Sequence, residues 1–240
     1  NEGQRGAGVA YYNSDGSINN TTIEANYVLS GYSGYGVHAY SGSDLDINNS
    51  VIIRNYKNYA GNSGQGGGVN YSASSGTISN TLIAYNEAFT GSAMYFENAN
   101  NINILNSTIY SDESSDGWDG VIVIANSDVN IENSVYDVYQ GYDRIKIFGD
   151  NSSLQISYSF IEDGQASIVD WDSYLADGTL IWGIGNIEEN EGVGGYGPQF
   201  QNPLEDNFTL KYYSRLIDAG DPSSELDPDG TVADMGAYPL

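Results

Sequence analysis

Residues 18–23 read Ile-Asn-Asn-Thr-Thr-Ile, the first copy of a phrase, Ile-x-Asn-(Ser/Thr)-x-Ile, that recurs along the chain. Further copies begin at Ile47, Ile78 and Ile104, and variants occupy residues 131–136 and 156–161. The second apolar residues of the copies follow at intervals of 29, 31, 26, 27 and 25 residues, and they are Ile23, Ile52, Ile83, Ile109, Tyr136 and Ile161. A repeat of this length indicates a solenoid.

The spacing inside the phrase predicts a corner. Side chains of a strand alternate between two faces, so two residues that both point inward lie an even number of positions apart. The two isoleucines of each copy are five positions apart, for example Ile18 and Ile23. Asn tolerates the left-handed backbone conformation that a bend needs. Each copy is therefore predicted to be strand, corner, strand.

Two columns of Asn are expected if each repeat is one coil of a parallel β-helix, because equivalent residues then lie about 4.8 Å apart. The first column consists of Asn20, Asn49, Asn80, Asn106 and Asn133, and the second of Asn26, Asn55, Asn86 and Asp112. We expect the amides of the first column to bond to one another as an Asn ladder. The isoleucines should line a dry interior, with the following Ser and Thr in the narrow corner.

The predicted architecture is an all-β, right-handed parallel β-helix of about seven coils with Asn ladders. Residues 1–183 would form the coils, and residues 184–240 an irregular segment of the same domain that packs on the final coil and closes that end. The alternative is a Gly- and Asn-rich β-sandwich. Six residues precede the first coil, too few for a cap. We expect either a segment of a longer protein or an open end that stacks on a second copy.

Composition excludes several classes of partner. Seven Lys and Arg oppose 32 Asp and Glu, which gives a formal net charge of −25. Such a chain repels nucleic acid and anionic membranes, since both are bound through cations. No stretch approaches the ~20 apolar residues of a membrane-spanning helix. The chain has no Cys, and its 30 Gly and 21 Tyr beside few Lys favour a secreted protein.

The C-terminal part carries a resemblance to a known family. It contains Pro-Gln-Phe-Gln-Asn-Pro at 198–203, Ile-Asp-Ala-Gly-Asp-Pro at 217–222 and Asp-Pro-Asp-Gly at 227–230. With the repeats, this ending resembles bacterial secreted right-handed β-helix proteins of the pectin-lyase-like superfamily. The resemblance implies location outside the cell or on its surface. That family includes polysaccharide lyases, hydrolases and non-catalytic surface proteins, so it leaves the activity open.

A calcium site is one candidate in this ending. Asp227 and Asp229 precede Gly230, and Asp218, Asp221 and Asp234 are close in sequence. Calcium takes six to eight oxygen ligands, which alternating Asp residues in a tight turn can supply. The alternative is that these carboxylates accept hydrogen bonds from backbone amides of the turns.

A pair of carboxylates is the weaker candidate for catalysis. Asp137 and Glu162 follow the second apolar residue in successive copies, so we expect them roughly 5 Å apart in adjacent coils, near the separation in retaining glycosidases. A lyase would need cations beside its base, and the seven Lys and Arg are scattered. His38 follows Val37 on an alternating strand, so we expect it to be exposed.

The side chains predicted to point outward beside the second apolar position form a candidate binding face. The residues before the second apolar position are Thr22, Val51, Leu82, Thr108, Val135 and Phe160. A face this apolar can pack on a neighbour or stack on sugar rings. We expect a non-catalytic extracellular module with a structural or adhesive role, with itself or a polysaccharide as partner. The alternative is a polysaccharide-active enzyme or a carbohydrate-binding module.

Overall fold

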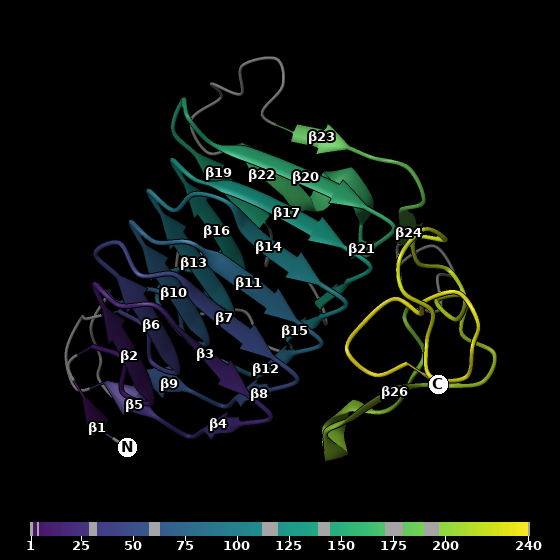
Figure 1. Ribbon diagram of the computed structural model, residues 1–240, viewed down its shortest axis with the longest axis horizontal. Helices are drawn as coiled ribbons and strands as arrows, with labels where there is room; N and C mark the ends of the chain where they lie inside the picture. The colour runs from purple at the N-terminus through teal and green to yellow at the C-terminus, as the bar shows by residue number, and fades with distance from the viewer. Residues whose placement is uncertain are drawn as a thin grey trace.

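The computed structural model describes residues 2–3, 5–28, 33–57, 63–111, 120–138, 145–170, 180–189 and 197–239. These residues wind into a parallel β-solenoid whose three main sheets each contain seven strands (Figure 1). Within each sheet, every strand pairs in parallel with its counterparts in the neighbouring coils. The predicted all-β class and parallel β-helix architecture are confirmed.

Each coil contributes one strand to each main sheet. The first sheet contains β2 (Val9–Tyr12), β6 (Val37–Tyr40), β10 (Val69–Ser72), β13 (Met94–Glu97), β16 (Ile122–Ala125), β19 (Ile145–Phe148) and β22 (Ile168–Asp170). The second contains β3 (Gly16–Asn19), β7 (Leu45–Asn48), β11 (Gly76–Ser79), β14 (Ile102–Leu105), β17 (Asp128–Glu132), β20 (Ser153–Ser157) and β23 (Leu180–Trp182). The third contains β4 (Thr22–Glu24), β8 (Val51–Ile53), β12 (Leu82–Ala84), β15 (Thr108–Ser111), β18 (Val135–Val138), β21 (Phe160–Glu162) and β24 (Ile187–Glu189).

Shorter elements complete the described chain. A fourth sheet joins β1 (Glu2–Gly3), β5 (Tyr27–Val28) and β9 (Tyr56–Lys57). Two 3-10 helices, η1 (Gly164–Ser167) and η3 (Pro203–Glu205), and an antiparallel pair, β25 (Phe200–Asn202) with β26 (Asn207–Leu210), follow later in the chain.

Two details of the predicted layout need correction. In each seven-stranded sheet, five strands have neighbours on both sides, so about five turns are enclosed and the prediction of about seven coils is slightly high. The predicted end of the coils at residue 183 is too early, because β24 pairs in parallel with β21. The solenoid therefore continues through Glu189.

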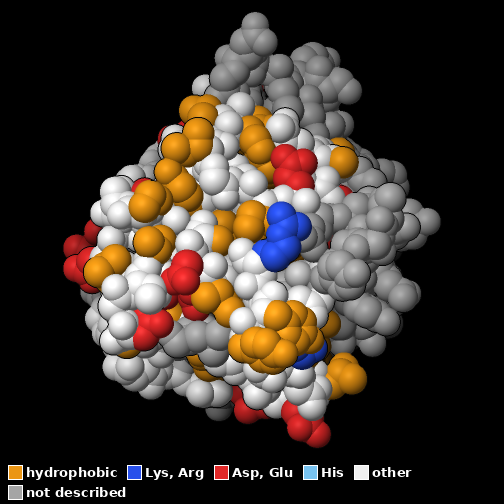
Figure 2. Space-filling model, turned by 90° about the vertical axis from the view of Figure 1, so that its right-hand side faces the viewer, with side chains coloured by type: hydrophobic (Ala, Val, Ile, Leu, Met, Phe, Trp, Pro, Cys, Tyr) orange, Lys and Arg blue, Asp and Glu red, His pale blue; other side chains and the backbone are white. Residues whose placement is uncertain are grey.

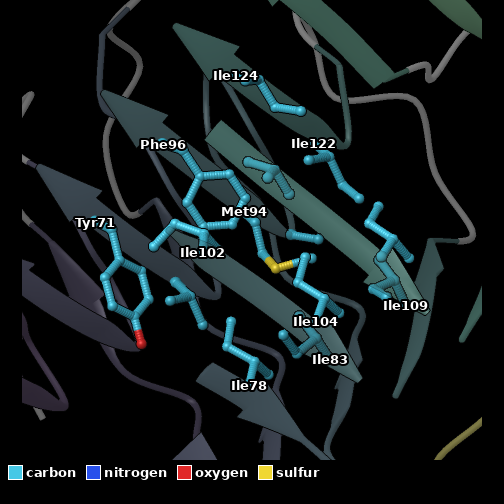
Figure 3. Packing of buried hydrophobic residues seen from close by; sticks show 14 of the residues in the cluster. Tyr71, Ile78, Ile83, Met94, Phe96, Ile102, Ile104, Ile109, Ile122 and Ile124 are labelled. Atoms are coloured by element: carbon cyan, nitrogen blue, oxygen red, sulfur yellow. The ribbon is translucent and has the colours of Figure 1, made fainter. Parts of the chain in front are cut away.

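The repeated isoleucines form the interior, as predicted. Both isoleucines of the phrase are buried in every copy, with Tyr136 in one of the second positions. Figure 3 shows side chains from several coils pointing toward one another, among them Met94, Phe96 and Ile104. Tyr71 also lies in this core, and its hydroxyl donates a hydrogen bond to the Leu45 carbonyl oxygen at 2.6 Å. Stacking thus buries an apolar face that one coil alone would leave exposed.

The first Asn column bends the chain through its backbone. Its members have φ between 45° and 49°, in the left-handed region that Asn tolerates. Among the described residues, no hydrogen bond joins successive amides of this column, so the predicted ladder at these positions is wrong. The Ser or Thr that follows each Asn joins the coils instead. Its backbone N–H donates a hydrogen bond to the hydroxyl oxygen of the equivalent residue in the following coil, at 3.1–3.3 Å. The donors are Thr21, Ser50, Thr81, Ser107 and Ser134.

The side-chain amides of the second Asn column are bonded from coil to coil and form a ladder. Asn26 Nδ2 donates to Asn55 Oδ1 at 2.9 Å, and Asn55 Nδ2 donates to Asn86 Oδ1 at 2.9 Å. All three side chains are buried. The fourth predicted member, Asp112, lies outside the described residues. The ladder satisfies amides that burial would otherwise leave unpaired.

The C-terminal segment lies against the side of the solenoid (Figure 1, right). The outward side chains of the third sheet, among them Leu82, Tyr110 and Phe160, form one buried cluster with Phe200, Phe208 and other residues of this segment. Backbone N–H groups of Ala237 and Gly236 donate to Thr108 Oγ1 and to the Asn133 carbonyl oxygen. We predicted a segment packed on the final coil; Ile187 of β24 packs against this cluster, and the segment also contacts Thr108 and Asn133 in the middle of the sheet.

Figure 2 shows this side of the molecule, where exposed hydrophobic side chains lie in separate groups and carboxylates are more widespread than Lys and Arg. In the described part of the chain, no helix has both the length and the apolar character needed to span a membrane.

Candidate functional site

The acidic residues of the C-terminal segment accept hydrogen bonds from backbone amides. Asp234 Oδ1 accepts the N–H of Asp218 at 2.8 Å, and Asp227 Oδ2 accepts the N–H of Asp234 at 2.6 Å. Asp221 and Asp229 each accept the backbone N–H of the residue two positions later. Such bonds are typical of Asx turns. They agree with the alternative to calcium that the sequence left open.

The same residues repel one another. Partial burial raises the pKa of Asp227, and the negative charges of Asp234, Asp229 and Asp218 raise it further, while the hydrogen bond from the Asp234 backbone lowers it. Among the described residues, no group of three or more His, Asp or Glu side chains is arranged to hold a metal ion. Calcium binding at Asp218, Asp221, Asp227, Asp229 and Asp234 stays a prediction.

The predicted carboxylate pair, Asp137 and Glu162, lies at the ends of neighbouring strands of the third sheet. The register of β18 with β21 aligns Tyr136 with Ile161, so Asp137 and Glu162 follow at the same step of adjacent coils. Asp137 is buried. One carboxylate oxygen of Glu162 accepts the backbone N–H of Val138 at 2.6 Å. This bond gives Glu162 a structural role in joining the two coils.

A polar groove lies on the outward face of the first sheet. Its volume is about 270 Å³, and its lining residues are Arg5, Ser33, His38, Tyr40, Ser41, Gln65, Asn70, Ser72, Ala73 and Glu97. Adjacent coils supply the floor, because β6 and β10 place His38 beside Asn70 and Tyr40 beside Ser72. Glu97 continues the second of these rows on β13. We call this site the first-sheet groove.

The floor of the groove holds polar atoms without partners. His38 is 3% exposed and Asn70 is 1% exposed. Neither ring nitrogen of His38 has a hydrogen-bond partner, and Asn70 Oδ1 also lacks one. Burial, with a smaller contribution from the positive charge of Arg5, lowers the pKa of His38 to about 4. The imidazole is therefore neutral at pH 7, with one nitrogen that donates and one that accepts.

Aromatic rings border these polar groups. The Tyr40 ring stacks on His38 with centroids 4.6 Å apart, and it contacts Tyr12 at 5.0 Å. The Arg5 guanidinium lies 5.7 Å from the centre of the Tyr40 ring. Tyr12 is 64% exposed, so its ring is open to solvent at the edge of the groove.

Glycines explain why outward side chains are buried here. Gly34 and Gly66 have φ of +68° and +66°. A Cβ on Gly34 would lie 2.4 Å from the Cβ of His38, and a Cβ on Gly66 would lie 2.8 Å from the Cβ of Asn70. The turn before each strand therefore lies directly over the outward side chain four residues later. The prediction that His38 is exposed is wrong for this reason. Strand alternation correctly placed it outward but could not reveal the covering turn.

A shallower hollow lies on the second sheet. It has a volume of about 150 Å³, and its residues include Asn103, Asn130 and Gln155, which occupy one row of three successive coils. Asn130 Oδ1 is buried without a partner. This hollow lies on a different sheet from the first-sheet groove, and Ile102, Val129 and Ile181 also line it.

Sequence reasoning did not find the first-sheet groove. A signal was present, since glycine precedes the outward residue by four positions in Gly34–His38, Gly66–Asn70 and Gly91–Tyr95, each with positive φ. The groove combines buried polar atoms that lack hydrogen-bond partners with a neighbouring aromatic surface. Searches of known protein families, of curated proteins and of solved structures find no match to this chain.

Proposed function

We propose that this protein is a non-catalytic adhesive module, secreted or held at the cell surface, that binds a polysaccharide through the outward face of its first sheet. The observation that carries the proposal is the first-sheet groove, where two buried polar side chains, His38 and Asn70, have atoms without partners. Buried polar groups are nearly always hydrogen-bonded, by protein, water or ligand. A hydroxyl-rich ligand supplies partners of both kinds.

Binding without turnover agrees with the charges at the groove. Glycosidases commonly use two carboxylates, and among the described residues that line the groove Glu97 is the single Asp or Glu. A general base works best with a pKa near the operating pH, whereas the pKa of His38 is about 4. The paired candidates Asp137 and Glu162 lie on the third sheet, away from this groove.

The wider assignment rests on the C-terminal motifs. Their resemblance to bacterial pectin-lyase-like surface proteins supports kinship with that superfamily and a location outside the cell. The surplus of carboxylates agrees with this location and argues against nucleic acid as a partner.

A second role, end-to-end association of copies, has its own support. The partly buried side chains that pack against the main core all lie in the first and last coils; they are Val9, Tyr11, Ile168, Leu180 and Trp182. The strands of these coils are also the edge strands of the three sheets. Unpaired edges with apolar side chains favour pairing with another chain.

Binding and turnover are tested together. The protein is mixed with insoluble polysaccharides of neutral and acidic types, and the bound fraction, new reducing ends and unsaturated uronate are measured. We expect sedimentation of the protein with at least one neutral polysaccharide and no products. Products that disappear in Asp137→Asn would make the protein an enzyme and overturn the proposal.

Association is tested by light scattering over a range of concentrations and by negative-stain imaging. We expect species whose mass rises with concentration and that lengthen in one direction. Isolated single particles at every concentration would remove the filament role and leave adhesion untouched.

A further inference from the structure

We infer that the first-sheet groove is a binding site for one neutral, hydroxyl-rich ring, a sugar residue or a cyclic polyol, and that Glu97 excludes uronic acids from it. This inference rests on the proposed adhesive function and specifies the class of ligand. It draws on three properties of the groove: its size, its hydrogen-bonding groups and its charges.

The size fits a small ligand. Pockets for drug-sized molecules occupy roughly 300–1,000 Å³. The groove, at about 270 Å³, is slightly below that range. It therefore holds one ring rather than an extended chain, and neighbouring residues of a polysaccharide would lie outside it, near the exposed ring of Tyr12. Aromatic rings at such a rim offer an apolar surface to a sugar face.

The hydrogen-bonding groups suit hydroxyls. Neutral His38 has one donor and one acceptor nitrogen, and Asn70 Oδ1 is an acceptor, all without partners. A hydroxyl group both donates and accepts, so a ring with several hydroxyls can satisfy these atoms together. Ser72 and Gln65 add further polar side chains to the lining. An apolar ligand would leave the buried atoms unpaired, which disfavours its binding.

The charges disfavour an acid. In the part of the lining that the structure describes, there is one carboxylate, Glu97, and one fixed cation, Arg5. Arg5 lies over the Tyr40 ring, whereas Glu97 follows Ser72 in the same row of adjacent coils. A ligand carboxylate beside Glu97 would meet like charge in a partly desolvated site, which weakens its binding.

His38 gives the experiment a unique probe, because it is the single histidine of the chain. The imidazole resonances of the full chain are followed by NMR at pH 7 while glucose, galactose, mannose, N-acetylglucosamine, myo-inositol, glucuronate and galacturonate are added separately. We expect saturable shifts with at least one neutral ring in the millimolar range. The two uronates should leave the resonances unchanged.

Three variants sharpen the test and keep the probe. Asn70→Ala should weaken binding of the neutral ring at least tenfold. Glu97→Gln removes the charge at nearly constant shape and should allow the uronate related to the bound sugar to shift His38. Asp128→Asn, which removes one charge beside the second-sheet hollow, is the matched control and should not admit the uronate. Melting curves establish that each variant folds.

The outcomes separate this inference from the proposed function. No His38 shift with any neutral ring means that the groove holds ordered water only, and the inference fails. If the protein still sediments with a polysaccharide in that case, adhesion stands and its site lies elsewhere. If uronates bind equally well to the native chain and to Glu97→Gln, the selective role of Glu97 is wrong.

Discussion

One residue type serves two purposes in this solenoid. Asn49 turns the corner with φ of 49° and is exposed, whereas Asn55, six positions later, is fully buried and joins its amide to both neighbouring coils. The sequence pattern correctly indicated a corner and a column of Asn, but it assigned the ladder to the wrong column. The periodicity alone contains no information on which amide the corner turns inward.

Replacing a ladder Asn should cost much more stability than replacing a corner Asn. Asn55→Ala removes the side-chain donor to the Ile23 carbonyl oxygen and one acceptor of Asn26 Nδ2, both buried, so we expect a loss of about 3 kcal/mol in the free energy of unfolding. Asn49→Ala introduces strain at positive φ and should cost roughly 1 kcal/mol. Asn49→Gly should be nearly neutral. Denaturant unfolding measures all three, and equal losses for Asn55→Ala and Asn49→Ala would contradict these roles.

His38 should make stability depend on pH. Its pKa in the folded chain is about 4, below the ordinary 6.5, because burial disfavours the charged form and Arg5 is nearby. Between these values the unfolded chain binds more protons, so acidification destabilises the fold, by about 3 kcal/mol from pH 7 to pH 4. His38→Gln lacks this contribution, while the carboxylates are unchanged. We expect the native chain to lose more stability than His38→Gln over that range. Parallel curves would show that His38 titrates normally.

At the scale of elements, the C-terminal segment decides which faces are free. The outward residues of the third sheet were expected to pack on a neighbour, and the neighbour is this segment of the same chain. Phe208 packs at its centre, with ring centroids 5.1 Å from Tyr110 and 5.3 Å from Phe200. The third sheet therefore offers no apolar face to a ligand where this cluster covers it.

Phe208→Ala should loosen the segment. The side chain is 2% exposed, and truncation of a buried Phe typically costs 3–5 kcal/mol, so we expect a loss of about 3 kcal/mol. Amide hydrogen exchange should accelerate in residues 197–239 more than in the coils. Arg54→Ala is the control: its ion pairs to Asp206 and Glu24 are largely exposed and should contribute less than about 1 kcal/mol. Uniform acceleration along the chain would contradict a separate docking of the segment.

At the scale of the whole molecule, the net charge of −25 opposes folding, whereas the apolar core of the stacked coils favours it. Self-repulsion of this size keeps a protein soluble but opposes compact folding. In the acidic turns of the C-terminal segment, burial raises the pKa of Asp227, and repulsion from Asp234, Asp229 and Asp218 raises it further. A bound cation would relieve this repulsion, and so would loss of one charge.

Asp227→Asn tests whether these turns bind calcium or whether their Asp side chains only accept backbone hydrogen bonds. Because the pKa of Asp227 is raised in the folded chain, its ionised form destabilises the fold at pH 7, and that penalty disappears as the pH falls below the raised value. Without calcium, Asp227→Asn should melt at the same temperature as the native chain or higher. We expect calcium and chelator to leave the native midpoint unchanged if the turns act as caps. A midpoint raised by calcium in the native chain and not in Asp227→Asn would establish a calcium site.

The sequence by itself determined the solenoid, its interior and its corners, because a repeated phrase with an odd spacing between isoleucines fits few folds other than stacked coils. It also set the acidic charge that limits the choice of partner. Only the tertiary structure decided which faces are open: Phe208 covers one sheet from more than 40 positions beyond the phrase at 156–161, and Gly34 folds over His38. The Phe208 contact joins the coils to a segment outside the repeat, so no period predicts it; the glycine spacing recurs in the sequence, but only the structure shows that the turn covers the side chain.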